Sequence, residues 1–537
     1  MTWFKDCALL CILFGFLFFL GLGDRPLSNP DEGRYSEIPR EMLVTGDYIT
    51  PHLNGIKYFE KPPLLYWVQI LSFKSIGLNE WGARSPTAVF ALLGCLTTYL
   101  LARVLYTRKI GLHAACILGS SLLYFVMSHV LTIDMMLSFL FLACFSCFLI
   151  AVNLPVSSKT KVFLYYGFYF FAALAVLAKG LIGILFPISI LFFWIILLDG
   201  WAYLKKMPIF SGIFLFFIII IPWHLAVQIK NPEFFNFYIL DQQFLRFFTL
   251  ISERYQPFWF FMAILFFGFF PWNIYLLQSI KEVFLKIKTN KIQYRNELFL
   301  LLWASVIFLF FSVSKSKLIP YILPIFPPVS IMIAKTYSSE KNKSISSFTL
   351  IFTVFCMATA LLLACEKYLK NTFFQKYFLF LGGILILGIL SYFVLLRLNK
   401  KFIFLSLLVW SCVFNLTLSI ISTGLPIAST KPLLLELKKH LRPEDLVVSY
   451  HYYYQDMPFY LKRLITLVDT HGELDFGMQH QAHMQILSEN EFWGKWETKS
   501  RVYVMMSDRN YTRLLAEHRF HFIMQHEDDV LLTNHHL

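Results

Sequence analysis

Asp31 and Glu32 are adjacent carboxylates that follow the first apolar run of the chain, in the segment Asn29-Pro-Asp31-Glu32-Gly-Arg34-Tyr35. Two carboxylates followed by a cation could take part in catalysis or bind an ion. The simpler alternative is a solvated loop in which Asp31 caps a helix, since Asp is common at that position. Taken alone, this segment favours the cap, and further polar segments are needed to indicate a site.

A second segment combines a carboxylate, a cation and two prolines, in the order Glu60-Lys61-Pro62-Pro63. Proline is well suited to the first helical position, so one of the two prolines is predicted to start a helix. Lys61 then lies at the positive N-terminal end of that helix, where an anion such as phosphate can bind. The alternative is an interfacial lysine beside aromatic residues, with its head group in water.

Asp134 follows Thr132 at the start of a long apolar run. The helix dipole favours a carboxylate in the first turn, which is a sufficient structural reason for Asp134. The functional alternative is that Asp31, Glu60 and Asp134 lie at one membrane depth and face one cavity. Charged groups at that depth are costly and are candidates for function.

The segment 314–324 carries cations next to an apolar run, with Lys315 and Lys317 close together and Pro320 and Pro324 after them. The prolines are predicted to loosen the helix that follows, because proline removes a backbone donor. Tyr321 between them could donate a hydrogen bond to a phosphate as a neutral group. This segment therefore supplies cations that could lie in the same site as the carboxylates described above.

The elements that must position these residues are membrane helices. Of the 537 residues, 57% are hydrophobic and 15% are charged, and the mean hydropathy is +0.61, whereas soluble chains carry about 25% charged residues. This composition excludes a cytosolic enzyme, a disordered regulator and a secreted disulfide scaffold. The net charge of +14 reflects Lys and Arg in loops and does not indicate a nucleic-acid partner.

The chain contains about thirteen apolar runs long enough to cross a bilayer, and all are predicted to be helices. The predicted spans are residues 7–22, 85–105, 110–127, 135–152, 162–178, 181–198, 209–227, 257–280, 298–313, 318–334, 346–363, 377–396 and 402–421. The first could instead be a cleaved signal peptide, but its length and phenylalanine content favour a retained helix.

Lys and Arg concentrate in alternate loops, which the positive-inside rule assigns to the cytoplasm together with the N-terminus. The segments 24–84 and 228–256 and everything after residue 421 then lie on the outer side. We therefore expect two domains, a membrane domain of residues 1–421 and a soluble outer domain of residues 422–537. Short apolar runs alternate with turn residues in the second, which predicts a small α/β domain. The histidines of this tail fit no zinc-binding spacing.

Five segments together resemble one family. They are residues 31–35, 60–67 and 317–324, with residues 453–461 and 472–477 in the tail. They resemble the aminoarabinose lipid A transferases, the ArnT-like family within the protein-mannosyltransferase-like superfamily of type C glycosyltransferases. The resemblance runs nearly from end to end. It implies an all-α polytopic enzyme of the bacterial inner membrane with thirteen helices and a C-terminal periplasmic α/β domain.

The resemblance also implies partners and an activity. The enzyme would take an amino sugar from undecaprenyl phosphate and place it on a phosphate of lipid A, the lipopolysaccharide modification behind polymyxin resistance. We expect it to work as a monomer among membrane lipids, without nucleic acid.

The roles implied by the resemblance fall on particular residues. Lys61 and Tyr321 would hold the donor phosphate, assisted by Arg34 and Lys317. Asp31, Glu32 and Asp134 would border the sugar and acceptor pocket as catalytic residues.

A divalent cation such as zinc is implied beside Glu60. Where a histidine is expected to face that glutamate, this chain has Asp241-Gln242-Gln243. Either Asp241 replaces the histidine as an oxygen ligand, which favours harder cations such as magnesium, or no metal binds.

The chemistry of this reaction needs no strong base, because leaving group and nucleophile are both ionised phosphates. Positioning and neutralisation of the departing phosphate would supply catalysis, and in-line displacement would invert the anomeric centre. One alternative is a protein O-glycosyltransferase, in which Asp31 would be a true base. Another is a transporter, although internal repeats are lacking and the helix centres carry almost no charge.

Overall fold

The computed structural model describes residues 2–155, 159–245, 255–339, 354, 372–398, 402–424, 427–481, 486–498 and 500–536. Contacts divide the chain into two compact units, each formed by three separate segments. The first unit comprises residues 1–22, 84–225 and 236–424, and the second comprises residues 23–83, 226–235 and 425–537. The predicted division at residue 421 separates a membrane domain from a soluble domain and is not a division by contacts. It stays a prediction.

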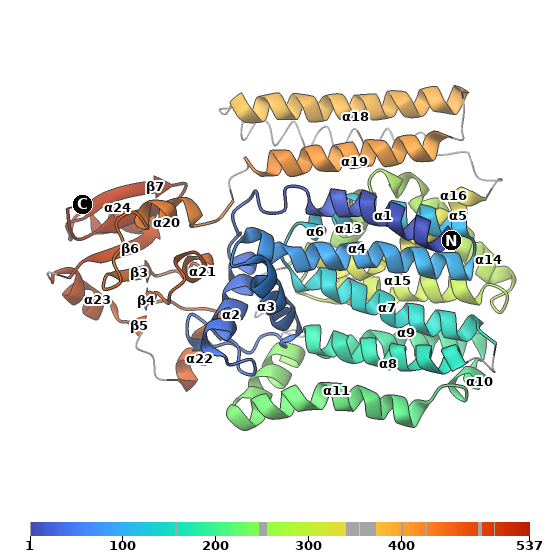
Figure 1. Ribbon diagram of the computed structural model, residues 1–537, viewed down its shortest axis with the longest axis horizontal. Helices are drawn as coiled ribbons and strands as arrows, with labels where there is room; N and C mark the ends of the chain where they lie inside the picture. The colour runs from blue at the N-terminus through green and yellow to red at the C-terminus, as the bar shows by residue number, and fades with distance from the viewer. Residues whose placement is uncertain are drawn as a thin grey trace. The chain divides into compact units, whose positions relative to one another are not determined.

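The named elements of the first unit are all helices (Figure 1). Its elements are α1 (Thr2–Phe19), α4 (Glu80–Leu105), α5 (Arg108–Ser120), α6 (Leu122–Ser128), α7 (Ile133–Asn153), α8 (Lys159–Lys179), α9 (Ile182–Leu198), α10 (Trp201–Leu204), α11 (Ile209–Lys230), η1 (Asn236–Leu245), α13 (Phe260–Gly268), η2 (Trp272–Tyr275), α14 (Leu276–Thr289), α15 (Arg295–Val313), η3 (Ile319–Ile325), α16 (Phe326–Ser338), α18 (Thr372–Leu398) and α19 (Ile403–Ser422). Helices α18 and α19 run side by side, and α7 packs along α8.

Within the described ranges, eight helices are long and apolar enough to cross a membrane, or up to ten if each bent pair counts as one span. Large apolar side chains point outward from them, and Phe210 is 92% exposed. Exposed apolar surface on this scale is costly in water and is expected where helices meet lipid. The chain is thus a multi-span membrane protein, as its composition predicts.

Two predicted spans are broken in the structure. Residues 110–127 form α5 and α6, which meet at 64°, and residues 257–280 fall on α13 and on the helical stretch Trp272–Thr289, which meet at 111°. The first break falls at Ser121, whose backbone is extended, and the second falls next to Pro271, which has no backbone N–H to continue the helix. The predicted span 346–363 lies outside the described residues, apart from Val354.

The predicted loosening of the chain near residue 320 is confirmed. Residues from Ile319 to Ile325 form the 3₁₀-helix η3, with Pro320 in its first turn and Pro324 inside it. The side-chain hydroxyl of Ser138 in α7 donates a hydrogen bond to the Leu323 carbonyl at 3.3 Å. This turn therefore lies against α7.

The second unit contains short helices and two sheets. Its elements are α2 (Asp31–Thr45), β1 (His52–Leu53), β2 (Ile56–Lys57), α3 (Leu64–Ile76), α20 (Lys431–Leu437), β3 (Leu446–Tyr450), α21 (Asp456–Leu461), β4 (Thr466–Val468), α22 (Asp475–His480), β5 (Ile486–Leu487), α23 (Glu489–Trp496), β6 (Val502–Ser507), α24 (Asp508–Leu514), β7 (His521–His526) and β8 (Asp529–Thr533). The prediction of an α/β domain in the tail is confirmed.

The six-stranded sheet of this unit has the order β5-β4-β3-β6-β8-β7. Strands β5, β4, β3 and β6 are parallel, whereas β8 is antiparallel to β6 and β7 to β8. The chain moves outward from β3 to β4 and β5 and then returns to β6 on the other side of β3. The sheet therefore has a topological switch point between β3 and β6.

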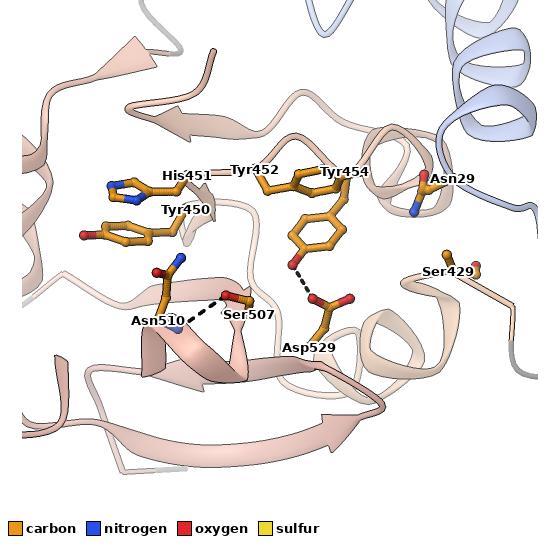
Figure 2. A pocket seen from close by; sticks show the side chains of 10 residues that line it. Asn29, Ser429, Tyr450, His451, Tyr452, Tyr454, Ser507, Asn510 and Asp529 are labelled. Carbon is orange, nitrogen blue, oxygen red and sulfur yellow. Dashed lines mark hydrogen bonds between the residues drawn. The ribbon is translucent and has the colours of Figure 1, made fainter. Parts of the chain in front are cut away.

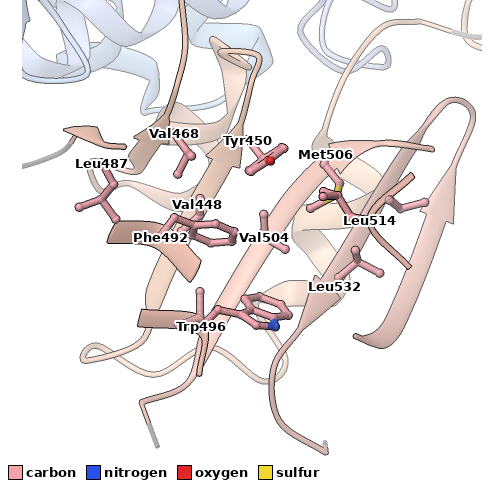
Figure 3. Close-up of a cluster of buried hydrophobic side chains, with 12 residues drawn as sticks. Val448, Tyr450, Val468, Leu487, Phe492, Trp496, Val504, Met506, Leu514 and Leu532 are labelled. Carbon is pink, nitrogen blue, oxygen red and sulfur yellow. The ribbon is translucent and has the colours of Figure 1, made fainter. Parts of the chain in front are cut away.

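Apolar side chains from the sheet and its helices form the core of this domain (Figure 3). Val448 of β3 and Val504 of β6 are fully buried and pack with Phe492 and Trp496 of α23. Alternation along β3 and β6 places these side chains on one face of the sheet. This core fixes the positions of the strand ends that the following sections use.

Asp456 joins the tail to the segment before α2 within the second unit. Its carboxylate accepts hydrogen bonds from Asn29 at 2.6 Å and from the hydroxyls of Ser429 and Thr430 at 2.8 Å each. A Cβ on Gly33 would lie 2.6 Å from the backbone nitrogen of Asp456, so only glycine allows α2 to approach this closely. The segment before α2 and the tail around Asp456, which are far apart in sequence, therefore pack against each other.

Candidate functional site

Helix α2 positions the predicted residues of the segment 29–35. Its first residue follows Pro30, and no side-chain cap forms there, so the alternative in which Asp31 caps the helix is wrong. The buried carboxylate of Glu32 accepts hydrogen bonds from the backbone nitrogen and the hydroxyl of Ser28 at 3.0 and 3.1 Å. Glu32 thus holds the chain at the start of α2.

Arg34 is the centre of a polar cluster in the second unit. Its guanidinium is ion-paired with Asp31 on the same helix and with Glu473, and its side chain is 10% exposed. Its Cζ lies 5.3 Å from the ring centroid of Tyr35 and 6.0 Å from that of Tyr58. Burial opposes the charge, but Tyr58 and Glu473 raise the pKa of Arg34, so the guanidinium stays charged.

Glu473 is held in place by its own partners. Gln455 donates a hydrogen bond to its Oε1 at 2.6 Å, and the Tyr58 hydroxyl donates to its Oε2 at 3.4 Å. Gln455 lies within the tail segment 453–461 that carries part of the family resemblance. The tail therefore supplies both the carboxylate that pairs with Arg34 and the Gln455 amide that orients this carboxylate.

Two buried donors of this cluster have no hydrogen-bond partner among the described residues, namely Arg34 Nε and the Tyr66 hydroxyl. Burial raises the pKa of Tyr66 well above its usual range, so its hydroxyl keeps its proton and can donate. Orphaned buried donors are costly and call for an explanation such as a bound ligand. An anionic oxygen is an acceptor that suits each of these donors. We call Asp31, Arg34, Tyr58, Tyr66 and Glu473 the Arg34 cluster.

Glu60 and Lys61 lie just before helix α3, which starts at Leu64. A helix begins here as predicted, but Pro63 is its N-cap and not its first helical residue. Both side chains are partly exposed. Burial and Arg34 have the largest effects on the pKa of Tyr58, and the Glu60 carboxylate raises it as well. Glu60 therefore lies within electrostatic range of the Arg34 cluster. Phosphate binding by Lys61 stays a prediction.

The first unit contains a second polar cluster around Lys179, the last residue of α8. Its ammonium is ion-paired with Asp134 in the first turn of α7 and lies 4.5 Å from the ring centroid of Tyr321 in η3. The ring of Tyr321 packs on Phe311 at 5.0 Å. Two of the predicted residues, Asp134 and Tyr321, are thus brought together. We call Asp134, Lys179 and Tyr321 the Lys179 cluster.

Lys317 is 5% exposed, and its ammonium donates a hydrogen bond to the backbone carbonyl of Gln256 at 3.0 Å. Burial lowers its pKa. The same ammonium lies 6.0 Å from the ring centroid of Tyr255. Lys317 therefore links the segment before η3 to the backbone at Gln256. Its binding of a donor phosphate stays a prediction.

A metal beside Glu60 also stays a prediction, because the side chain of Asp241 lies outside the described part of the chain. Within that part, one group of three has ligand atoms within 4.8 Å of one another, His451, Asp469 and Glu489. These residues follow the parallel strands β3, β4 and β5. The sequence could not indicate this group, because its members come together only through strand pairing.

Several residues of the two clusters were not predicted from the sequence. Tyr58 lies outside the segments singled out in the sequence, Tyr66 lies in the segment 60–67 only as part of the family resemblance, and Lys179 was given no role. Glu473 lies in a tail segment noted for its resemblance, and its pairing with Arg34 has no local sequence signal.

Two family models match the chain. Residues 25–238 match the dolichyl-phosphate-mannose-protein mannosyltransferase family, and residues 433–534 match the aminoarabinose transferase C-terminal domain. Both matched families are named for sugar transferases, and the first match includes helices of the membrane-spanning unit.

Curated relatives and a solved structure extend the match. The undecaprenyl phosphate-alpha-4-amino-4-deoxy-L-arabinose arabinosyl transferase 1 of Proteus mirabilis is 32% identical over 61% of this chain and 58% of its own length. The corresponding enzyme of Wigglesworthia glossinidia brevipalpis is 28% identical over 93% of this chain and 92% of its own length. The crystal structure of ArnT from Cupriavidus metallidurans bound to undecaprenyl phosphate is 26% identical, covers 98% of this chain and 97% of that one, and has a TM-score of 0.84. Over almost its whole length the chain is therefore similar to the ArnT-type aminoarabinose transferases.

Proposed function

We propose that this protein transfers an amino sugar from undecaprenyl phosphate to a phosphate of lipid A at the periplasmic face of the bacterial inner membrane. The main support is the similarity over almost the whole chain to the ArnT structure that holds undecaprenyl phosphate. The orphaned donors of Arg34 and Tyr66 give independent support, since they suit an anionic oxygen.

In this proposal the residues act mainly by charge and position. Arg34 and Lys61 bind the phosphate of the donor, and Tyr66 donates a hydrogen bond to it. As the bond between the anomeric carbon and the phosphate oxygen breaks, negative charge grows on that phosphate, and the cations stabilise it. Asp31 and Glu473 hold the guanidinium of Arg34 in place.

The acceptor phosphate attacks the anomeric carbon from the opposite side, and its oxygen forms the new glycosidic bond. No proton has to be removed, because that phosphate is already ionised at neutral pH. The configuration at the anomeric carbon is therefore inverted. Tyr321, Lys317 and Asp134 are proposed to serve the same reaction, and a divalent cation beside Glu60 remains part of this proposal.

Mass spectrometry of lipid A tests the proposal directly. Cells that express the chain with its donor pathway are expected to contain lipid A heavier by one amino sugar, attached to a phosphate. Cells without the chain provide the control. Unchanged lipid A together with a glycosylated protein would contradict the proposed acceptor.

The second candidate is a protein O-glycosyltransferase, favoured by the match of residues 25–238 to the protein mannosyltransferase family. A Ser or Thr acceptor needs a general base, which contributes about 10²–10⁴-fold to the rate. For a phosphate acceptor, Asp31→Asn is expected to reduce transfer by less than about 100-fold, because only the support of Arg34 is weakened.

The Asp31→Asn measurement compares turnover of purified variants on lipid A. Asp47→Asn is a matched control, since Asp47 is also an ion-paired carboxylate of the second unit, with Lys230 as its partner. A complete loss of turnover in Asp31→Asn alone would favour Asp31 as a general base and contradict the expected mechanism.

A further inference from the structure

A cavity of about 410 Å³ lies in the second unit at the carboxyl ends of β3 and β6 (Figure 2). Tyr450 is the last residue of β3 and Ser507 is the last residue of β6, and both line it. Ligands of open α/β sheets bind in the crevice outside the strand ends at a topological switch point. The volume falls within the range of about 300–1,000 Å³ that is typical of small-molecule sites. None of these residues belongs to the Arg34 or Lys179 cluster.

Aromatic rings form the walls of this crevice. The rings of Tyr450 and His451 are stacked, with centroids 4.1 Å apart and an angle of 10° between their planes. The rings of Tyr452 and Tyr454 meet edge to face at 4.8 Å. Such rings offer flat apolar surfaces with polar tips, which suit a ligand with a carbon ring and polar substituents.

Polar groups in the crevice are available for a ligand. The Tyr452 hydroxyl and the side-chain amide of Asn510 have no hydrogen-bond partner among the described residues, although both line the cavity. Asp529 uses its Oδ1 to accept the hydrogen bond of the Tyr454 hydroxyl, which leaves its Oδ2 available. A hydroxyl, an amide and a carboxylate together can both donate to and accept from sugar hydroxyls.

The charge of the crevice selects among sugars. No Lys or Arg is among its lining residues, and Asp529 supplies a negative charge. Burial and the neighbouring Asp528 and Glu527 raise the pKa of Asp529, while the hydrogen bond from Tyr454 and the nearby His526 lower it. An ammonium group would pair with this carboxylate, whereas a phosphate would be repelled.

We infer that the crevice between the ends of β3 and β6 is a second binding site, for a sugar that carries an amino group. The ring of the sugar packs on Tyr452 and Tyr454, its hydroxyls bind Asn510 and Tyr452, and its ammonium pairs with Asp529. The inference uses only the cavity and its lining, and it would hold whatever reaction the two clusters carry out.

Saturation-transfer NMR on the full chain in phosphatidylcholine nanodiscs tests this inference, with D-glucosamine as the probe at a pH where its amine is protonated. D-glucose and D-glucose 1-phosphate are the matched sugars, and a chelator is present so that no metal near His451 contributes. We expect glucosamine to bind most tightly and glucose 1-phosphate least. Absence of glucosamine binding, or preference for the phosphate, would overturn the inference.

Variants locate the site. Tyr452→Ala and Asn510→Ala are each expected to weaken glucosamine binding by about tenfold, and Asp529→Asn to abolish the preference for glucosamine over glucose. Tyr48→Ala is the control, because Tyr48 is also an exposed tyrosine of the second unit and does not line the cavity. Equal binding by all four variants and the unchanged chain would place the sugar elsewhere and overturn the inference.

A final experiment tests whether the sugar is free or part of a lipid. Nanodiscs that contain a lipid with an amino-sugar head group are compared with nanodiscs without it. Displacement of glucosamine by this lipid supports a lipid-linked ligand, and unchanged binding supports a free sugar. The samples contain no undecaprenyl donor and no lipid A, so the outcome does not depend on the proposed reaction.

Discussion

Replacing Lys61 by alanine is expected to lower sugar transfer by about 100- to 1,000-fold while the protein folds normally. Under the proposed function, the Lys61 ammonium stabilises charge that develops on the departing phosphate. Loss of one such group from a preorganised site typically costs about 10²–10³ in turnover. Lys61 is partly exposed, so its removal leaves no large cavity.

The Lys61 prediction is measured as transfer of labelled sugar from undecaprenyl phosphate in membranes with equal amounts of each variant. Lys74→Ala is the control, since Lys74 lies at the other end of α3 and is exposed. Normal turnover in Lys61→Ala would show that this lysine does not bind the donor phosphate.

Lys179→Met is expected to reduce both stability and transfer. The side chains of Lys179 and Asp134 are only 11% and 8% exposed, so the substitution leaves a buried carboxylate without its counter-ion. Removing one partner of a buried pair typically costs about 3–5 kcal/mol. Transfer should fall as well, because Lys179 is the cation next to Tyr321.

A double variant separates these two effects. Lys179→Met combined with Asp134→Asn removes both charges, so the unfolding temperature in detergent is expected to recover towards that of the unchanged protein. Transfer is expected to stay low, because the cation is still absent. Recovery of both properties would instead mean that the pair only stabilises the fold.

The sequence predicted the helices well because each apolar run is a local signal. It did not predict where two spans break, since Ser121 and Pro271 lie within runs that look continuous. The tail was predicted as an α/β domain, but its strand order was not. Strands as short as β5, with two residues, have no readable period, and parallel pairing depends on contacts between distant segments.

The candidate site was predicted where a residue type was unusual for its place. Arg34 and Lys61 are cations on the predicted outer side, and Asp134 is a carboxylate predicted to lie at the membrane depth of Asp31 and Glu60. Glu473 and Tyr66 did not stand out, because their roles depend on which residues the fold places beside Arg34. The chemistry of a cluster can thus be anticipated from one member, but its other members require the structure.

The pairing of Arg34 with Glu473 has a consequence for how the protein is made. The two residues are separated by 439 positions, so a ribosome that adds about 5–20 residues per second needs roughly 20 to 90 s to reach the second after the first. For most of that time Asn29 also lacks its hydrogen-bond acceptor, Asp456. The segment before α3 can therefore complete its packing only after Glu473 has been translated. A chain that terminates early would contain most of its apolar helices and still leave the guanidinium at position 34 without its second carboxylate.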